Sequence, residues 1–424
     1  MFGPHGRSLG SETLAPLWAC ALVTLATGSG CPGPSRPVGV RPAEPLRTVR
    51  DICVLLAVSQ SDVRVRVFGR YVIRNRQGEV FSQDVQLPWT IISGDSGVVF
   101  GGRPLGNAWI EIVPDPGGAV AVSQQLEAGW SATRQYGGHL RLLAQADGSV
   151  KVINVVDLET YVAGVLPGEL YPDFQRESFR AQAIAARTYA LYEMSTNSRA
   201  DYDVTATEGS QVYEGMSDTA VYHKACEAAG TTRGLVCTWT SLAGERIFCT
   251  YFSSACGGMT QSVADAKTVH NIPPLAGGVR CDFCRIAKGE AYRWMPRRIS
   301  LAEVMTRIAA RYPQVQKLGR LLDVRVTGWT AGDRVGSVAL IGEAGDSLEL
   351  PGENFRLAVG SRFMRSTDCR IRVDGAAVVF EDGKGFGHAM GLCQWGMEGQ
   401  ARLGRTAPQI LAYYYPQSHV RRAY

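Results

Sequence analysis

The stretch D-L-E-T-Y-V-A-G-V-L-P-G-E-L, from Asp157 to Leu170, decides the fold because the pattern of the chain changes there. Its acidic start and the apolar run that follows predict a short helix. After Pro167-Gly168 we expect a loop that contains Glu169 and leads into a long, alanine-rich helix from Arg176 to Met194. Strand-like sequence lies on both sides, so the predicted class is α+β, a strand-rich mixed fold with a few helices.

The sequence before this stretch is typical of strands. Val63 to Val67 alternates valine with arginine, as in a strand with one buried face. Similar short runs are separated by turns, and the chain contains 48 glycines and 20 prolines. We therefore predict an N-terminal β-rich region over residues 49–156. A second region over residues 157–424 would contain a strand-rich subdomain around residues 320–380.

The first fifty residues predict export. His5 and Arg7 precede an apolar run from Leu14 to Ala26 that is too short to span a bilayer, and small residues precede Cys31. We interpret residues 1–30 as a signal segment and residues 31–48 as a linker rich in proline, glycine and arginine. Cleavage with or without a lipid on Cys31 stays open, and any membrane contact would be made through that lipid. Either outcome places the protein in the periplasm or the cell envelope.

The charge balance excludes one class of partner. The chain has 44 Lys+Arg against 39 Asp+Glu, a formal net charge of +5, and no long run of one sign. This is not the footprint of a nucleic-acid-binding protein. A mildly basic surface would suit an anionic polymer such as the cell wall.

Three separated stretches carry the residues that can do chemistry. The first runs from Asp157 to Leu191. The second is Y-F-S-S-A-C-G-G-M-T from Tyr251 to Thr260, and the third is G-F-G-H-A-M-G-L-C-Q-W-G-M from Gly385 to Met397. In order and spacing, from about Val49 to the C-terminus, this combination resembles the family of stage II sporulation protein D (SpoIID) and the amidase enhancer LytB.

The resemblance implies a lytic transglycosylase. Such an enzyme cleaves the bond between N-acetylmuramic acid (MurNAc) and N-acetylglucosamine (GlcNAc) in peptidoglycan glycan strands, often after an N-acetylmuramoyl-L-alanine amidase has removed the peptides. The family's catalytic acid falls on Glu169. From the residues alone, a carboxylate beside a helix start would be expected to interact with the helix dipole. The resemblance favours catalysis instead.

Two other functions compete with this one. The first is a non-catalytic wall-binding module that activates the amidase, as part of the family is described as doing. The second, a zinc peptidase or amidase, is disfavoured because the sequence has no H-E-x-x-H motif.

The substrate-binding candidates are polar, aromatic and glycine residues of the three stretches. Polar side chains on the tightly packed long helix must find partners, so they are either structural hubs or site residues. Glycines of the third stretch would let the backbone approach a sugar, although Ala389 replaces one glycine of the family pattern. The predicted substrate-binding residues are Gln182, Arg187, Tyr189, Ser253, Ser254, Gly257, Gly258, His388, Gln394 and Trp395.

The cysteines predict either a zinc site or disulfides. A C-x-x-C pair and a cysteine in the second stretch supply three thiolates, and Cys393 is the expected fourth ligand, with His270 a weaker candidate. Four protein ligands leave no open position, so the zinc would be structural and the chemistry would need no cofactor. Disulfides are the alternative in an exported protein. The predicted metal ligands are Cys256, Cys281, Cys284 and Cys393, and the further disulfide candidates are Cys226, Cys237 and Cys249.

Overall fold

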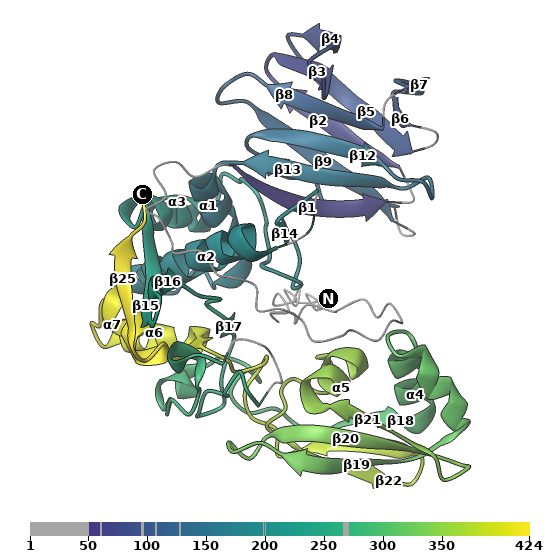
Figure 1. Ribbon diagram of the computed structural model, residues 1–424, viewed down its shortest axis with the longest axis vertical. Helices are drawn as coiled ribbons and strands as arrows, with labels where there is room; N and C mark the ends of the chain where they lie inside the picture. The colour runs from purple at the N-terminus through teal and green to yellow at the C-terminus, as the bar shows by residue number, and fades with distance from the viewer. Residues whose placement is uncertain are drawn as a thin grey trace, which may run out of the picture.

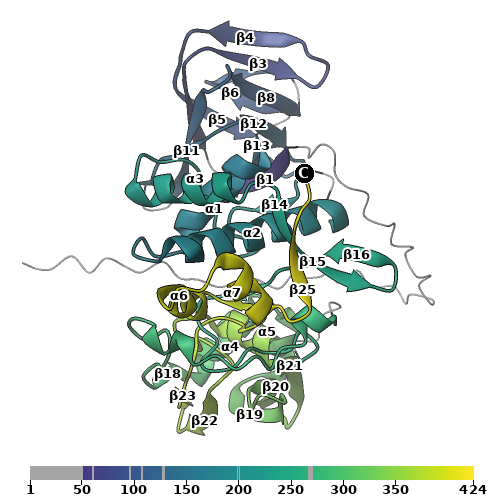
Figure 2. The ribbon, with the colours of Figure 1, turned by 90° about the vertical axis from the view of Figure 1, so that its left-hand side faces the viewer.

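In the computed structural model, the described residues are 51–59, 62–94, 97–106, 108–126, 129–197, 199, 201–265 and 271–424. The predicted signal segment and linker, Cys31 and His270 lie outside them. Figure 1 shows three parts arranged one below another: a β-rich part at the top, a helical layer in the middle and a smaller mixed part at the bottom. Figure 2 shows the same order from the side.

The N-terminal part contains two sheets whose buried faces contribute to one hydrophobic core. In β2, Val63, Val65 and Val67 are buried whereas the arginines between them are not, which is the alternation of a half-buried strand. In sheet order, the first sheet contains β14 (Val204–Thr205), β1 (Ile52–Ser59), β13 (Val150–Val156), β12 (His139–Ala144), β8 (Trp109–Pro114), β3 (Tyr71–Asn75) and β4 (Val80–Asp84). The second contains β10 (Gly129–Trp130), β9 (Ala119–Leu126), β2 (Val63–Phe68), β5 (Leu87–Gly94), β6 (Val98–Phe100) and β7 (Arg103–Pro104), with β11 (Arg134–Tyr136) also on β9.

The helical layer is assembled from sequence segments that lie far apart. Its long helix packs against the helix before it, the helix after it and two helices that follow almost 200 residues later. The helices are α1 (Leu158–Glu169), α2 (Arg176–Thr196), α3 (Ala220–Thr231), α6 (Gln394–Arg402) and α7 (Ala407–Tyr414). Two small sheets complete the layer: β16 (Gly244–Ile247), β15 (Leu235–Ser241) and β25 (Ser418–Arg422) form one, and β17 (Phe252–Ser253) pairs in parallel with β24 (Leu392–Cys393) in the other.

The third part has a hydrophobic core of its own, built from residues between Trp294 and Phe380. It therefore begins earlier in the chain than the predicted subdomain around residues 320–380. Its elements are β18 (Arg297–Ser300), α4 (Leu301–Ala309), β19 (Leu321–Trp329), β20 (Val335–Gly342), β21 (Ser347–Pro351), α5 (Gly352–Val359), β22 (Arg370–Asp374) and β23 (Ala377–Glu381). Short 3-10 helices lie at Pro273–Leu275, Phe283–Ile286 and Pro313–Leu318.

These elements confirm the predicted α+β class. One detail of the prediction is wrong: Glu169 does not lie in a loop but is the last residue of α1. Pro167 is accommodated inside this helix, and the N–H of Leu170 closes the final turn on the carbonyl of Leu166 at 2.9 Å. Among the described residues, no helix combines the length and the apolar character needed to cross a membrane.

Candidate active site around Glu169

Helix α1 places Glu169 at its C-terminal end. Asp157 caps the other end, where its carboxylate accepts the backbone N–H groups of Glu159 and Thr160. In the last turn, a Cβ on Gly168 would lie 2.5 Å from the carbonyl oxygen of Val212. Glycine at this position therefore lets the segment that follows β14 approach the end of α1 closely enough to bond Glu169.

The carboxyl group of Glu169 is buried and held from two sides. The backbone N–H of Val212 donates to Oε1 at 2.9 Å, and Nε2 of Gln394 donates to Oε2 at 3.2 Å and to the carbonyl oxygen of Glu169 at 3.1 Å. Only 8% of the residue is exposed. The two hydrogen bonds and this burial fix the direction of the group without an ion pair among the described residues.

Burial raises the pKa of Glu169 from its ordinary 4.5 to about 7, because the ionised form loses its hydration. The hydrogen bonds from Val212 and Gln394 oppose this rise, and the negative charge of Glu208 adds to it. The negative end of the α1 dipole acts in the same direction as burial. A carboxyl group with this pKa can both donate and accept a proton near neutral pH.

Helix α6 brings Gln394 to this carboxyl from more than 220 residues away in the sequence. The side chain of Glu398 fastens the helix to the start of α2, where it accepts from the N–H of Gln175 and from Oγ of Ser178, both at 2.7 Å. Trp395, 1% exposed, packs on Tyr171 and Phe174 with ring centroids 5.1 and 4.9 Å away. The prediction that Trp395 binds substrate is therefore wrong for this structure, since the ring is in the core.

The loop before α6 contains His388, which is buried. Its Nδ1 accepts the N–H of Met390 at 2.9 Å, and burial lowers the pKa of His388 to about 4, so the imidazole is neutral at neutral pH. Ala389 has a φ of 60°, the left-handed conformation that favours glycine. The replacement of the family's glycine by Ala389 thus places a Cβ in a strained backbone conformation.

Residues of the second stretch form hydrogen bonds to this loop and to the first turn of α6. Oγ of Ser253 accepts the N–H of Ala389 at 3.1 Å, and the carbonyl of Ser254 accepts the N–H of Trp395 at 3.0 Å. Both serines are buried. Gly257 has a φ of 76°, and a Cβ there would lie 3.0 Å from the backbone of Gly385, whereas Gly258, with a φ of 125°, has more space. The prediction that the serines bind substrate is thus replaced by a supporting role.

The candidates on α2 are also in the interior. Gln182 and Arg187 are fully buried and Tyr189 is buried beside them in the core, so none can contact a glycan in this conformation. Arg187 binds Glu159 through two hydrogen bonds of 3.0 and 2.5 Å and also donates to the carbonyls of Ala229 and Leu235. It is a structural hub that joins α1, α2, α3 and β15, and the prediction of substrate binding is wrong for these three residues.

Three charged residues near the site were not predicted. Glu353 and Arg356 on α5 form a buried ion pair, and both act on the pKa of His388. Glu208, exposed in the segment after β14, acts on the pKa of Glu169. All three lie outside the three stretches singled out in the sequence, and no local pattern distinguishes them from ordinary surface charges.

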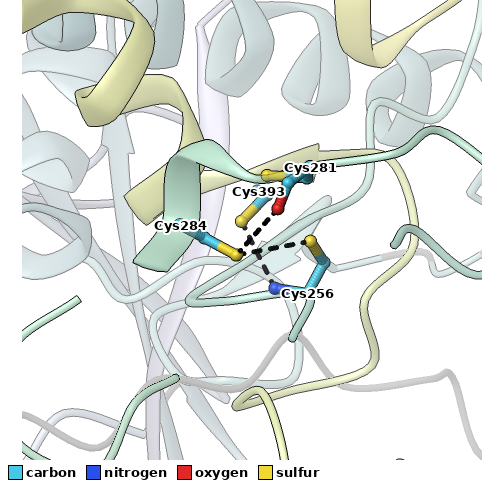
Figure 3. Close-up of side chains that lie close together, drawn as sticks. All are labelled: Cys256, Cys281, Cys284 and Cys393. Carbon is cyan, nitrogen blue, oxygen red and sulfur yellow. Dashed lines mark hydrogen bonds between the residues drawn. The ribbon is translucent and has the colours of Figure 1, made fainter. Parts of the chain in front are cut away.

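The structure brings together the four predicted metal ligands, here called the cysteine cluster: Cys256, Cys281, Cys284 and Cys393. Their sulfur atoms all lie within 4.8 Å of one another and are all buried (Figure 3). The closest pair described by a contact, Cys256 and Cys284, is 3.8 Å apart. The four cysteines of the cluster are free thiols, and so are Cys226 and Cys237, two of the alternative disulfide candidates.

Comparison with known proteins agrees with this architecture. A family model described as Stage II sporulation protein (SpoIID) matches residues 146–239, the segment that contains α1, α2 and α3. An uncharacterized protein of Brachyspira hyodysenteriae is 30% identical over 287 residues, which cover 66% of this chain and 71% of the relative. Stage II sporulation protein D of Bacillus subtilis is 28% identical over 286 residues, 63% of this chain and 75% of the relative. An amidase enhancer of the same organism is 23% identical over 301 residues, 60% of this chain and 39% of the relative.

The matched segment and the buried carboxyl at the end of α1 define a SpoIID-type domain. Within the helical layer, α1, α2 and α3 lie inside the matched segment, whereas α6 with Gln394 lies outside it. The chain belongs to the SpoIID/LytB family and is a cell-wall related protein.

Proposed function

We propose that this protein is a lytic transglycosylase that cleaves the MurNAc–GlcNAc bond of peptidoglycan glycan strands and leaves 1,6-anhydroMurNAc ends. The observation that carries the proposal is the Glu169 carboxyl, buried at the end of α1, with a pKa raised to about 7 and with both oxygens bonded to fixed donors. Family membership supplies the substrate class, since the chain is related to stage II sporulation protein D.

One carboxyl group suffices for this reaction. Protonated Glu169 gives its proton to the glycosidic oxygen as the bond from that oxygen to C1 of MurNAc breaks, and GlcNAc leaves with a free 4-hydroxyl group. The resulting carboxylate takes the proton of the MurNAc 6-hydroxyl while its oxygen bonds C1. The product is the 1,6-anhydro sugar, no water is consumed, and Glu169 ends protonated as it began. Intramolecular attack benefits from proximity and needs no second activating group.

A hydrolase would instead need two carboxyl groups, one of them to activate water or to act as a nucleophile. Glu208 is the carboxylate that acts electrostatically on Glu169, so it is the residue to test for such a role. We expect it to adjust the proton affinity of Glu169 without taking part in bond cleavage.

The deciding experiment is mass analysis of products from purified, peptide-free glycan strands. Wild-type protein should release 1,6-anhydroMurNAc ends, Glu169→Gln should bind glycan and release none, and the matched control Glu208→Gln should still release them. Reducing-end MurNAc from the wild type would identify water as the nucleophile and reject the lyase. Full activity of Glu169→Gln would remove this residue from the reaction.

A second function, activation of an N-acetylmuramoyl-L-alanine amidase without catalysis, is favoured by one observation. A relative is named an amidase enhancer, although it is only 23% identical. In the proposed function an amidase is the partner that prepares peptide-free strands. If purified protein cleaves no glycan but accelerates a separate amidase on intact peptidoglycan, the non-catalytic function is correct.

Peptidoglycan as substrate requires that the catalytic part act outside the cytoplasm. We therefore propose export to the periplasm or cell envelope, in line with the basic and then apolar start of the sequence. N-terminal sequencing of the mature protein should find a chain that begins near Cys31, and detergent partitioning distinguishes a lipid-anchored form from a free one. A mature chain that still begins at Met1 would contradict export by this route.

A further inference from the structure

The cysteine cluster is built by three separate segments of the chain. Cys256 follows β17, Cys281 and Cys284 lie at the short 3-10 helix Phe283–Ile286, and Cys393 ends β24 immediately before α6. Figure 3 shows the four side chains pointing toward a common centre. Burial of four thiols at one point from distant segments is not needed for a hydrophobic core, which the surrounding aliphatic and aromatic residues already supply.

The distances fit a tetrahedral metal ion better than disulfides. With a Zn–S bond of about 2.3 Å, tetrahedral geometry places the sulfur atoms about 3.8 Å apart. The Sγ atoms of Cys256 and Cys284 are 3.8 Å apart, and the whole group lies within 4.8 Å. A disulfide requires about 2.05 Å, and these cysteines are free. Small movements of side chains would therefore complete a metal site.

Hydrogen-bond donors lie beside two of the sulfur atoms, those of Cys393 and Cys281. Sγ of Cys393 accepts the backbone N–H groups of Cys256 and Gly396, each at 3.3 Å, and the hydroxyl of Tyr414 lies 3.1 Å from Sγ of Cys281. Donors of this kind stabilise the negative charge of a metal-bound thiolate. A Cβ on Gly396 would lie 2.6 Å from Sγ of Cys281, so glycine leaves room for the sulfur.

We propose that the cysteine cluster binds one Zn²⁺ as a closed structural site and that this ion positions the first turn of α6, which presents Gln394 to Glu169. Four thiolates fill the tetrahedron and leave no position for water or substrate, so the ion does not enter the reaction. Thiolate ligands select Zn²⁺ over harder cations such as Mg²⁺.

The link to the site is short. Cys393 is the N-cap of α6, where its sulfur accepts the N–H of Gly396, and the next residue is Gln394, whose Nε2 bonds Glu169. A metal bond on Cys393 thus fixes the backbone that aims this amide. Zinc binding itself is independent of the proposed function, whereas the effect on catalysis rests on it.

The first test is the zinc content of the full-length protein, purified in the presence of zinc and without chelator, by inductively coupled plasma mass spectrometry. We expect about one equivalent per chain, as a four-ligand site requires. Replacement by Co²⁺ should give the intense visible bands of a tetrahedral thiolate complex. Cys281→Ser should lose most of the zinc, whereas Cys369→Ser, a buried cysteine outside the cluster, should keep it.

Zinc-free protein with four free thiols, or a mass that shows disulfides among the cluster residues, would overturn the proposal even if Cys281→Ser did not fold.

The second test asks whether the zinc ion positions Gln394. Removal of zinc by a chelator should weaken the Gln394 contact, and because that contact lowers the pKa of Glu169, this pKa should rise, as it should in Gln394→Leu. A chelated protein that has lost its zinc but keeps the wild-type pKa of Glu169 would refute the positioning role while leaving the metal site intact.

Discussion

Replacement of Glu169 by glutamine should change the stability of the protein in opposite directions at low and high pH. The carboxyl has an ordinary pKa of 4.5 in the unfolded chain and about 7 in the folded chain. Between these values the folded state binds more protons, so the free energy of unfolding falls as the pH rises and levels off above about 7. At about 1.4 kcal/mol for each pH unit, the difference amounts to about 3 kcal/mol.

In Glu169→Gln the free energy of unfolding does not fall in this way with pH, but the variant loses one hydrogen bond. Glutamine can still accept the N–H of Val212 through its oxygen, but its amide nitrogen then faces Nε2 of Gln394, which is also a donor. One lost hydrogen bond costs about 1 kcal/mol. Glu169→Gln should therefore be about 1 kcal/mol less stable than the wild type at pH 4 and about 2 kcal/mol more stable at pH 8.

Urea unfolding of both proteins across this pH range measures the difference, and groups common to both cancel in the subtraction. The two stability curves should cross near pH 5 to 6, as the two opposing costs require. A difference that stays constant with pH would mean that Glu169 keeps its ordinary pKa, and the argument for a protonated carboxyl at neutral pH would fail. If the stability curves cross and Glu169→Gln also forms no anhydro products, the group with the raised pKa and the catalytic group are the same, namely Glu169.

Three further outcomes are expected. Glycan cleavage should decline as the pH rises through about 7, where Glu169 loses its proton. Glu208→Gln should move this decline to lower pH by less than about one unit, because it removes a negative charge that raises the pKa of Glu169. A pH profile identical to that of the wild type would show that Glu208 has no influence on Glu169. His388→Ala should slow the formation of anhydro products by less than the roughly 100-fold expected for loss of a catalytic acid or base, and it should leave the pH profile unchanged because the pKa of this buried histidine is about 4; complete loss of products in a folded protein would show a direct role. Arg187→Met should destabilise the fold by about 3 to 5 kcal/mol, because it leaves its carboxylate partner buried and unpaired; urea unfolding that matches the wild type would contradict the structural assignment.

The fold class was predictable because its signals are local. Alternating valines in β2 and the alanine-rich sequence of α2 need no knowledge of distant residues. The position of Glu169 inside a helix was not predictable, because Pro167-Gly168 suggests that the helix ends there, whereas in the structure it continues to Glu169. Gly168 lets the backbone at Val212 approach the last turn of the helix closely, an approach across 44 residues that the sequence does not reveal.

At the candidate site, the proximity of the four cysteines was predictable, whereas the burial of most of the substrate-binding candidates was not. Cys256 and Cys393 come together because β17 pairs with β24. Neither the second nor the third sequence stretch indicates this pairing when it is considered alone. Trp395 and Arg187 show the opposite case. In the sequence, an aromatic ring near glycines or an arginine on a packed helix is equally compatible with substrate binding and with a place in the core. Only the contacts with the distant residues Phe174 and Glu159 show that Trp395 and Arg187 belong to the core.

During synthesis, β15 and β17 leave the ribosome long before their partners β25 and β24, because the whole third part lies between them in the sequence. Until residues beyond 394 have emerged, the incomplete chain cannot form the contact between Gln394 and Glu169. Closure of such long loops also delays folding. The surroundings of the Glu169 carboxyl are thus completed only after α6 has been made, although α1, which carries this residue, is made more than 200 residues earlier.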